Sequence, residues 1–151
     1  MALTQQGFAV AGANPTTSTT ITIPAGVAAG DILLLAATNR DAVADPSVTD
    51  NDSGGNNWVK VKNQNAATNG AGTLWIKRAT GGTAGKTVTV SGMTGSMSCG
   101  LAYYRGASAE LIPFKAAVSE SNIAGNENQA TYTTLRPGSF LVHTIHVTSN
   151  D

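Results

Sequence analysis

Short runs of alternating apolar and polar residues, separated by glycine, asparagine and proline, recur along this chain. In Lys86–Ser91, for example, Val88 and Val90 fall on the same side of an extended strand. No stretch of ten or more residues has the apolar spacing of a helix, and parallel βαβ units need helical crossovers. The pattern therefore predicts an all-β fold, an antiparallel β-sandwich of jelly-roll-like type with about nine strands.

The expected strands are spaced at short intervals and end at turn residues. They are residues 7–11, 19–23, 31–37, 58–62, 73–78, 86–91, 98–104, 131–134 and 139–147. Residues 31–37 are apolar almost throughout, which predicts a central strand covered on both faces. Residues 41–57 and 63–72 are expected to form polar connections. Residues 109–128 fit either a loop packed on the sheet or a single helical turn.

A length of 151 residues predicts one domain, with residues 1–15 as the candidate for an N-terminal arm. The segments 24–34 and 135–142 are alike, because each is a Pro/Gly turn that leads into an apolar strand. Two interpretations stay open. The two segments are paired strands of one sandwich, or the second begins another repeat and the chain is truncated at its C-terminus.

The charges are few and balanced, with nine Lys and Arg against nine Asp and Glu. A protein that neutralises nucleic-acid phosphates needs a surplus of cations, and so does a polybasic membrane anchor. We therefore expect no nucleic-acid partner and no membrane partner. A surface that is polar through hydroxyl and amide groups, on a chain without net charge, favours association over repulsion.

The first residues lack the basic and apolar regions of a signal peptide, and the longest apolar run, 32–37, is too short to span a bilayer. These features predict a soluble chain made in a reducing compartment. Cys99 is the sole cysteine and lies in a predicted strand, so we expect a small buried core residue without a catalytic role.

Two short motifs resemble ligand-binding loops. Residues 81–87 end in Gly-Lys-Thr, but Thr80 replaces the first glycine of a P-loop and a strand follows, which favours a flexible hairpin loop. Asp50 and Asp52 are spaced like the first ligands of a calcium loop, although Val61 occupies position twelve, where an EF-hand has glutamate. A Ca²⁺ site completed by Asp41 or Asp45 and a turn capped by its own side chains both stay open.

Other candidate catalytic groups are poorly placed for catalysis. His143 and His146 are three apart, which puts them on opposite faces of a strand. The three glutamates, Glu110, Glu120 and Glu127, fall in the least regular region and form no close pair. Four aromatic residues could form a sugar-stacking platform: Trp58, Trp75, Tyr103 and Tyr104. For the two tryptophans, which lie in predicted strands, a position in the core is the simpler interpretation. We expect no catalytic residues and no cofactor.

Several turn and strand motifs follow one another in a distinctive order. They are P-x-G-x-x-x-G-D with an apolar run (Pro24–Ala36), D-x-x-G-N-x-W (Asp52–Trp58), the strands Leu74–Lys77 and Lys86–Val90, and A-x-Y-x-G at the end of Leu101–Gly106. In this order they resemble a β-sandwich domain of tailed-bacteriophage virion proteins. The resemblance covers residues 21–106, more than half of the chain.

This resemblance implies a jelly-roll or immunoglobulin-like sandwich that acts as a head decoration (cement) protein or as a tail or fibre module, and it brings no catalytic residues. We therefore expect a non-enzymatic protein, made in the host cytoplasm and located on the virion head, that binds the major capsid protein and copies of itself. The alternative is a fibre or adhesin module that binds host-surface glycan. Loops and arms vary most among sandwiches, and this places the expected interface at Gln5, Gln6, Asp41, Asp45 and Asn51.

Overall fold

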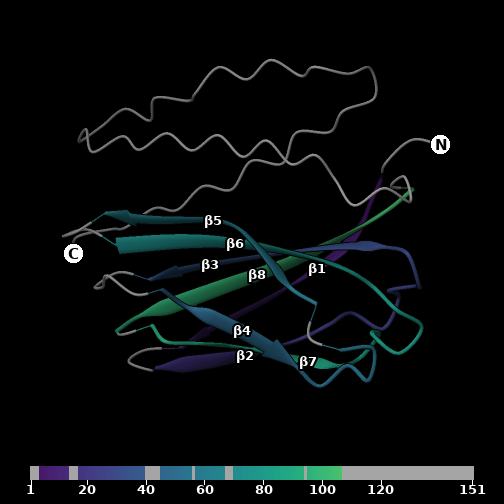
Figure 1. Ribbon diagram of the computed structural model, residues 1–151, viewed down its shortest axis with the longest axis horizontal. Coiled ribbons are helices and arrows are strands. Elements are labelled where there is room, and N and C mark those ends of the chain that lie inside the picture. Colours follow the sequence, from purple (N-terminus) through teal and green to yellow (C-terminus); the bar gives the residue numbers. More distant parts are fainter. Residues whose placement is uncertain are drawn as a thin grey trace, which may run out of the picture.

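A computed structural model describes residues 4–13, 17–39, 45–55, 57–66, 70–93 and 95–106. This part of the chain is all β and contains eight strands (Figure 1). They are β1 (Thr4–Ala13), β2 (Ser18–Thr22), β3 (Ile32–Asn39), β4 (Ser47–Asp50), β5 (Val59–Ala66), β6 (Gly70–Arg78), β7 (Thr87–Ser91) and β8 (Met97–Arg105). All pairings between them are antiparallel.

The strands form two sheets in the order of a jelly roll. One sheet runs β1-β8-β3-β6-β5 and the other runs β2-β7-β4. Among the described strands, β1 thus pairs with β8, β2 with β7 and β3 with β6, as in a jelly roll. β5 departs from that scheme because it forms a hairpin with β6 at the edge of the larger sheet. The predicted antiparallel β-sandwich is confirmed.

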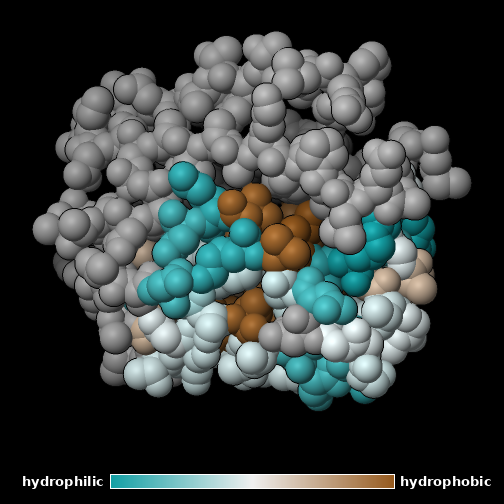
Figure 2. Space-filling model, in the orientation of Figure 1, coloured by the Kyte–Doolittle hydropathy of each residue, from teal (hydrophilic) through white to brown (hydrophobic). Residues whose placement is uncertain are grey.

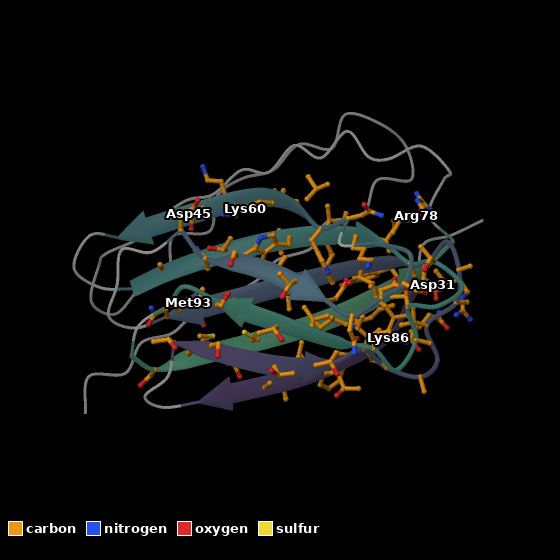
Figure 3. All side chains as sticks on the ribbon, turned by 60° about the horizontal axis from the view of Figure 1, so that its bottom comes forward. Asp31, Asp45, Lys60, Arg78, Lys86 and Met93 are labelled. Carbon is orange, nitrogen blue, oxygen red and sulfur yellow. The ribbon has the colours of Figure 1, made fainter. Side chains whose placement is uncertain are left out.

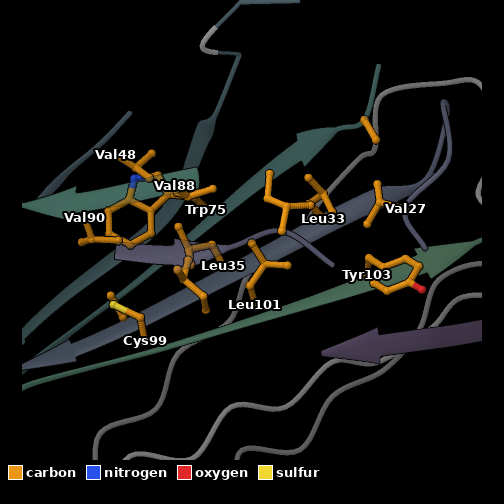
Figure 4. Packing of buried hydrophobic residues seen from close by; sticks show 14 of the residues in the cluster. Val27, Leu33, Leu35, Val48, Trp75, Val88, Val90, Cys99, Leu101 and Tyr103 are labelled. Carbon is orange, nitrogen blue, oxygen red and sulfur yellow. The ribbon is translucent and has the colours of Figure 1, made fainter. Parts of the chain in front are cut away.

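The core lies between the two sheets, where alternate side chains of each strand point inward (Figure 4). Val88 and Val90 of β7 are fully buried, as their spacing predicted. Leu33 and Leu35 of β3 meet them from the larger sheet, together with Trp75 of β6. Burial of each such side chain stabilises the fold by about 1.5–3 kcal/mol, so these contacts bind the sheets together.

β3 is the central strand of the larger sheet, and both of its faces are covered, as the apolar run predicted. Leu33 and Leu35 face the core between the sheets, while Ile32 and Leu34 face the other side. On that second face Leu34 lies in a separate buried cluster that includes Ile76 and Tyr104. A continuous apolar run is therefore needed here, because alternation would place polar groups in one of the two clusters.

Three expectations about connections were wrong. Residues 41–57 contain the strand β4, and residues 63–72 are mostly strand, because β5 ends at Ala66 and β6 begins at Gly70. The segment between β6 and β7 is not a hairpin loop, because it crosses from one sheet to the other. The expected strands at 131–134 and 139–147, the irregular segment 109–128, the two histidines and the three glutamates lie outside the described residues.

Cys99 is buried in the core, as predicted, and burial raises the pKa of its thiol to about 12. The reactive thiolate is therefore scarce in the folded protein. We expect a thiolate-specific reagent to leave the native protein unmodified at mildly alkaline pH and to label Cys99 when denaturant unfolds the chain. Rapid stoichiometric labelling of the native protein would contradict this position of the side chain.

Candidate functional site

A buried ammonium group lies between two buried carboxylates. Nζ of Lys77 is 2.6 Å from Oδ2 of Asp50 and 3.0 Å from Oδ2 of Asp52, and all three side chains are completely shielded from solvent. The same ammonium donates a hydrogen bond to the carbonyl of Gly55 at 3.0 Å. We call Lys77, Asp50 and Asp52 the ionic cluster.

The strand pattern explains how these charges come to be inside. Lys77 shares its side of β6 with Trp75 and Thr73, both of which are buried, so its side chain enters the sandwich. Asp50 ends β4 in the opposite sheet, and Asp52 lies in the turn that follows. The ionic cluster therefore connects β6 of the larger sheet to β4 of the smaller one.

Asp52 is held as an anion by several donors. Oγ1 of Thr83 and Oγ1 of Thr80 donate to its carboxylate, and the backbone N–H of Gly54 donates to Oδ1 at 2.9 Å. Burial alone would raise the pKa of Asp52, but the hydrogen bonds from Thr83 and Gly54 and the nearby Lys77 lower it well below its usual range. The carboxylate stays ionised at neutral pH.

Asp50 has a different set of donors. The indole N–H of Trp58 donates to Oδ2 of Asp50 at 2.6 Å, and the backbone N–H of Asp52 donates to Oδ1 at 3.1 Å. Nζ of Lys77 lies 6.0 Å from the centre of the Trp58 ring, within the range of a cation–π contact. Trp58 thus contacts both the carboxylate of Asp50 and the ammonium of Lys77.

Gly54 brings the turn against the loop between β6 and β7. A Cβ atom at Gly54 would lie only 2.6 Å from the side chain of Thr80, so another residue would push the turn away from Asp52 and its donors. The motif D-x-x-G-N-x-W also has a structural explanation, because its Asp52 binds Lys77, the carbonyl of its Gly55 accepts a hydrogen bond from Lys77, and its Trp58 donates to Asp50.

The predicted calcium ligands belong to this cluster. The Lys77 ammonium lies against Asp50 and Asp52, where the calcium hypothesis places a metal ion. Within the described ranges, no three His, Cys, Asp or Glu side chains are grouped so that they could hold a metal. Asp41, the other proposed ligand, lies outside those ranges, and Asp45 forms an ion pair with Lys60.

A second ion pair joins two other sequence motifs at one end of the sandwich. Nε and Nη2 of Arg105, at the end of β8, donate to the two oxygens of Asp31 at 3.0 and 2.8 Å. The backbone N–H of Ala28 also donates to Asp31. The hydrogen bond from Arg105 is the main reason why the pKa of Asp31 is lowered, although burial opposes it.

This ion pair borders an open surface depression. Its walls come from the turn before β3 and from the ends of β6 and β8: Ala28, Ala29, Gly30, Asp31, Arg78, Arg105 and Gly106. Figure 3 shows Asp31 and Arg78 at the same end of the molecule. Nη1 of Arg78 donates to the carbonyl of Gly30 at 2.8 Å, so this arginine also fixes the turn.

The residues predicted to form the interface do not share one surface. Gln5 and Gln6 are exposed on β1, at one edge of the larger sheet. Asp45 is exposed beside Lys60 of β5, at the other edge of that sheet (Figure 3). Asn51 is exposed as well, but its side-chain oxygen accepts a hydrogen bond from the backbone of Thr87. Asp41 lies outside the described residues.

The aromatic residues are mainly structural. Trp75 is buried, which confirms the core interpretation for this residue, and Tyr103 and Tyr104 are buried as well. Trp58 is half-buried and packs against the core cluster. Within the described part of the chain, the aromatic side chain that is largely exposed is Phe8, which is 70% exposed on β1 and was not among the residues proposed from the sequence.

Sequence reasoning also missed Lys77 as a buried residue. The signal was its position two residues after Trp75 in a predicted strand, which puts both side chains on the same face. Thr83, which is fully buried, gave no comparable signal, because it lies in a glycine-rich loop between strands.

Comparisons with known proteins add no relative, since no protein family, no curated protein and no solved structure matches this chain. No helix in the described ranges is long and apolar enough to cross a membrane. A function is thus inferred from the sequence motifs together with the fold, the ion pairs and the exposed surfaces.

Lys77→Met should strongly destabilise the fold. The substitution leaves Asp50 and Asp52 buried without their cation, and loss of one member of a buried ion pair typically costs about 3–5 kcal/mol. Urea unfolding followed by tryptophan fluorescence measures the change. Lys60→Met is the matched control, because it breaks an ion pair with the largely exposed Asp45 and should cost less than about 1 kcal/mol. Equal losses in the two variants would contradict the ionic cluster.

The stability of the fold should decrease in acid. The folded-state pKa of Asp52 is lowered, so its contribution is fully present above the unfolded-state pKa of about 4 and is lost as the pH falls toward the folded-state value. We expect the free energy of unfolding to decline below about pH 4. Asp52→Asn should be less stable at neutral pH and show a weaker decline in acid. An unchanged decline in this variant would mean that other carboxylates cause it.

Proposed function

We propose that this chain is a non-enzymatic structural protein of a tailed-bacteriophage virion, most specifically a decoration protein on the outside of the head. In this role it binds the major capsid protein and copies of itself. The proposal starts from the resemblance between its ordered motifs and those of virion β-sandwich domains. Its location on the virion, its partners and its lack of enzymatic activity are all parts of the same proposal.

The observation that carries the proposal is that the motif segments contact one another. Asp31 of the first motif binds Arg105 of the last motif. Asp52 of the second motif binds Lys77, which lies in the strand segment Leu74–Lys77. A Cβ atom at Gly26 would lie 2.6 Å from the hydroxyl of Tyr103, so the first motif also fits closely against β8. The resemblance thus rests on residues that stabilise the sandwich, as expected for a structural module.

The surface supports a role in assembly. Several of the few charged side chains lie in buried or half-buried ion pairs. On the face that Figure 2 shows, the described surface is mostly teal or white, with smaller brown areas. Polar groups without charge lose less hydration energy than ions when an interface covers them. Such a surface can pack against neighbouring subunits without repelling them.

Within the described residues, the ionisable groups that were candidates for chemistry serve the fold. Asp50 and Asp52 bind Lys77, and the thiol of Cys99 is buried with a raised pKa. A nucleophile or a general base needs access to substrate. The side chains of these three residues are shielded from solvent, which supports the non-enzymatic role.

Binding to heads tests the proposal. Purified chain should sediment with expanded phage heads that lack decoration, and it should raise the temperature at which the heads release their DNA. An unrelated neutral β-sandwich of similar size is the control. If the chain stays in the supernatant at saturating concentration, the decoration role is wrong.

Copy number in the virion separates this role from the alternative. A decoration protein is present in many copies per particle, whereas a fibre module is present in few, and quantitative mass spectrometry of purified virions gives the ratio to the major capsid protein. A low ratio together with binding to host-surface glycan would replace the decoration role by that of a fibre module.

A further inference from the structure

β1 is a long edge strand with an open side. Among the described strands it pairs only with β8, so its other side has no partner within them. It is ten residues long, it contains no charged residue and no proline, and its one irregularity lies near its start, between Gln5 and Gly7. Such an edge offers a row of backbone donors and acceptors to another strand.

The other three edges of the sandwich are protected. β5, at the far edge of the same sheet, has two lysines, Lys60 and Lys62, with an irregular register between them. In the smaller sheet the edges are β2 and β4, which have only five and four residues. Lysines, irregular pairing and short length are the usual means by which proteins prevent strand addition. Only β1, among the described edges, lacks them over most of its length.

The side chains of β1 add an apolar surface to this edge. Ala9 and Ala11 pack against the core, whereas Phe8 and Val10 point to the opposite face and are 70% and 73% exposed. They are two of the three large hydrophobic residues that are exposed in the described part of the chain. Exposed apolar groups next to an open strand edge mark a surface that another molecule covers.

These two residues continue apolar rows that cross the sheet. Strand register aligns Phe8 with Ala102 of β8, then Leu34 of β3 and Ile76 of β6. A strand added beyond β1 would extend these rows and cover the exposed sides of Phe8 and Val10.

We propose that β1 pairs with β1 of a second copy of this chain, antiparallel and around a two-fold axis at Ala9. The two five-stranded sheets then form one ten-stranded sheet. In this register Phe8 lies opposite the partner's Val10 and Val10 lies opposite the partner's Phe8. The two-fold axis forms this aromatic–aliphatic contact twice, and such cross-strand pairs stabilise antiparallel sheets.

A second copy fits this edge because of its charge and symmetry. β1 has no ionised side chain, so two copies meet without repulsion, and a neutral chain has no net charge that keeps its copies apart. Backbone hydrogen bonds from an antiparallel strand satisfy both edges equally. The inference specifies the self-association surface of the proposed virion protein and rests on that role, but it can be measured in solution without phage heads.

Sedimentation velocity over a concentration series tests the pairing. The native chain should shift from monomer to dimer as concentration rises. A variant with both Phe8→Lys and Val10→Lys should remain monomeric, because the introduced ammonium groups would face one another across the axis. Val59→Lys is the matched control: Val59 is 53% exposed on the opposite edge, so this variant should dimerise like the native chain.

Folding and the location of the contact need their own measurements. The three substituted side chains are exposed, so thermal unfolding of the dilute variants should match that of the native monomer. Hydrogen exchange should slow in residues 4–13 as the native protein is concentrated, and exchange in β5 should not change.

Three results of the sedimentation experiments would overturn the inference. A native chain that is monomeric at every concentration, a dimer that only Val59→Lys disrupts, or a trimer would contradict pairing of β1 around a two-fold axis. If the native chain is monomeric yet binds phage heads, the inference fails while the proposed function stands. If it forms the β1 dimer but does not bind heads, the proposed function fails and the pairing stands.

Discussion

The burial of Lys77 is the constraint on which much of the structure depends. An ammonium group inside a sandwich is costly unless its charge and its hydrogen bonds are satisfied. Two carboxylates and the carbonyl of Gly55 surround it, and the extra negative charge of the cluster is met by the N–H and O–H donors of Trp58, Thr80 and Thr83. The turn after β4 and the loop before β7 take their shape from this requirement.

The fold class was predictable because it depends on local pattern. Short apolar or alternating segments between turn residues identified seven of the eight described strands, and the continuous apolar run of β3 indicated that both of its faces are covered. β4 was missed because Ser47–Asp50 has a single apolar residue, Val48, within a long polar segment. The strand forms because Val48 reaches the core and Asp50 reaches Lys77, which are contacts with distant parts of the chain.

The candidate site was less predictable than the fold, because it too depends on contacts between distant parts of the chain. Asp50 and Asp52 were candidates for a Ca²⁺ site, with a self-capped turn as the alternative, and the cation that they bind is the ammonium of Lys77 from another strand. Spacing shows which side chains lie near one another within a loop, and it says nothing about which strand of the opposite sheet faces them. The exposure of Phe8 and Val10 also depends on sheet order, because the same residues on a central strand would be buried.

The two edges of the larger sheet therefore differ in whether they allow another strand to pair with them. On the side of β5, lysines and an irregular register oppose strand addition, and the nearby ionic cluster connects β6 to β4. On the side of β1, Ala9 and Ala11 pack against the core and the larger side chains of Phe8 and Val10 point outward. This strand contains no charged residue that would oppose strand addition. Stability and the proposed association thus depend on separate residues, and each can change without altering the other. A module with this separation suits repetition in an assembly, because its own fold does not require the proposed contact between β1 strands.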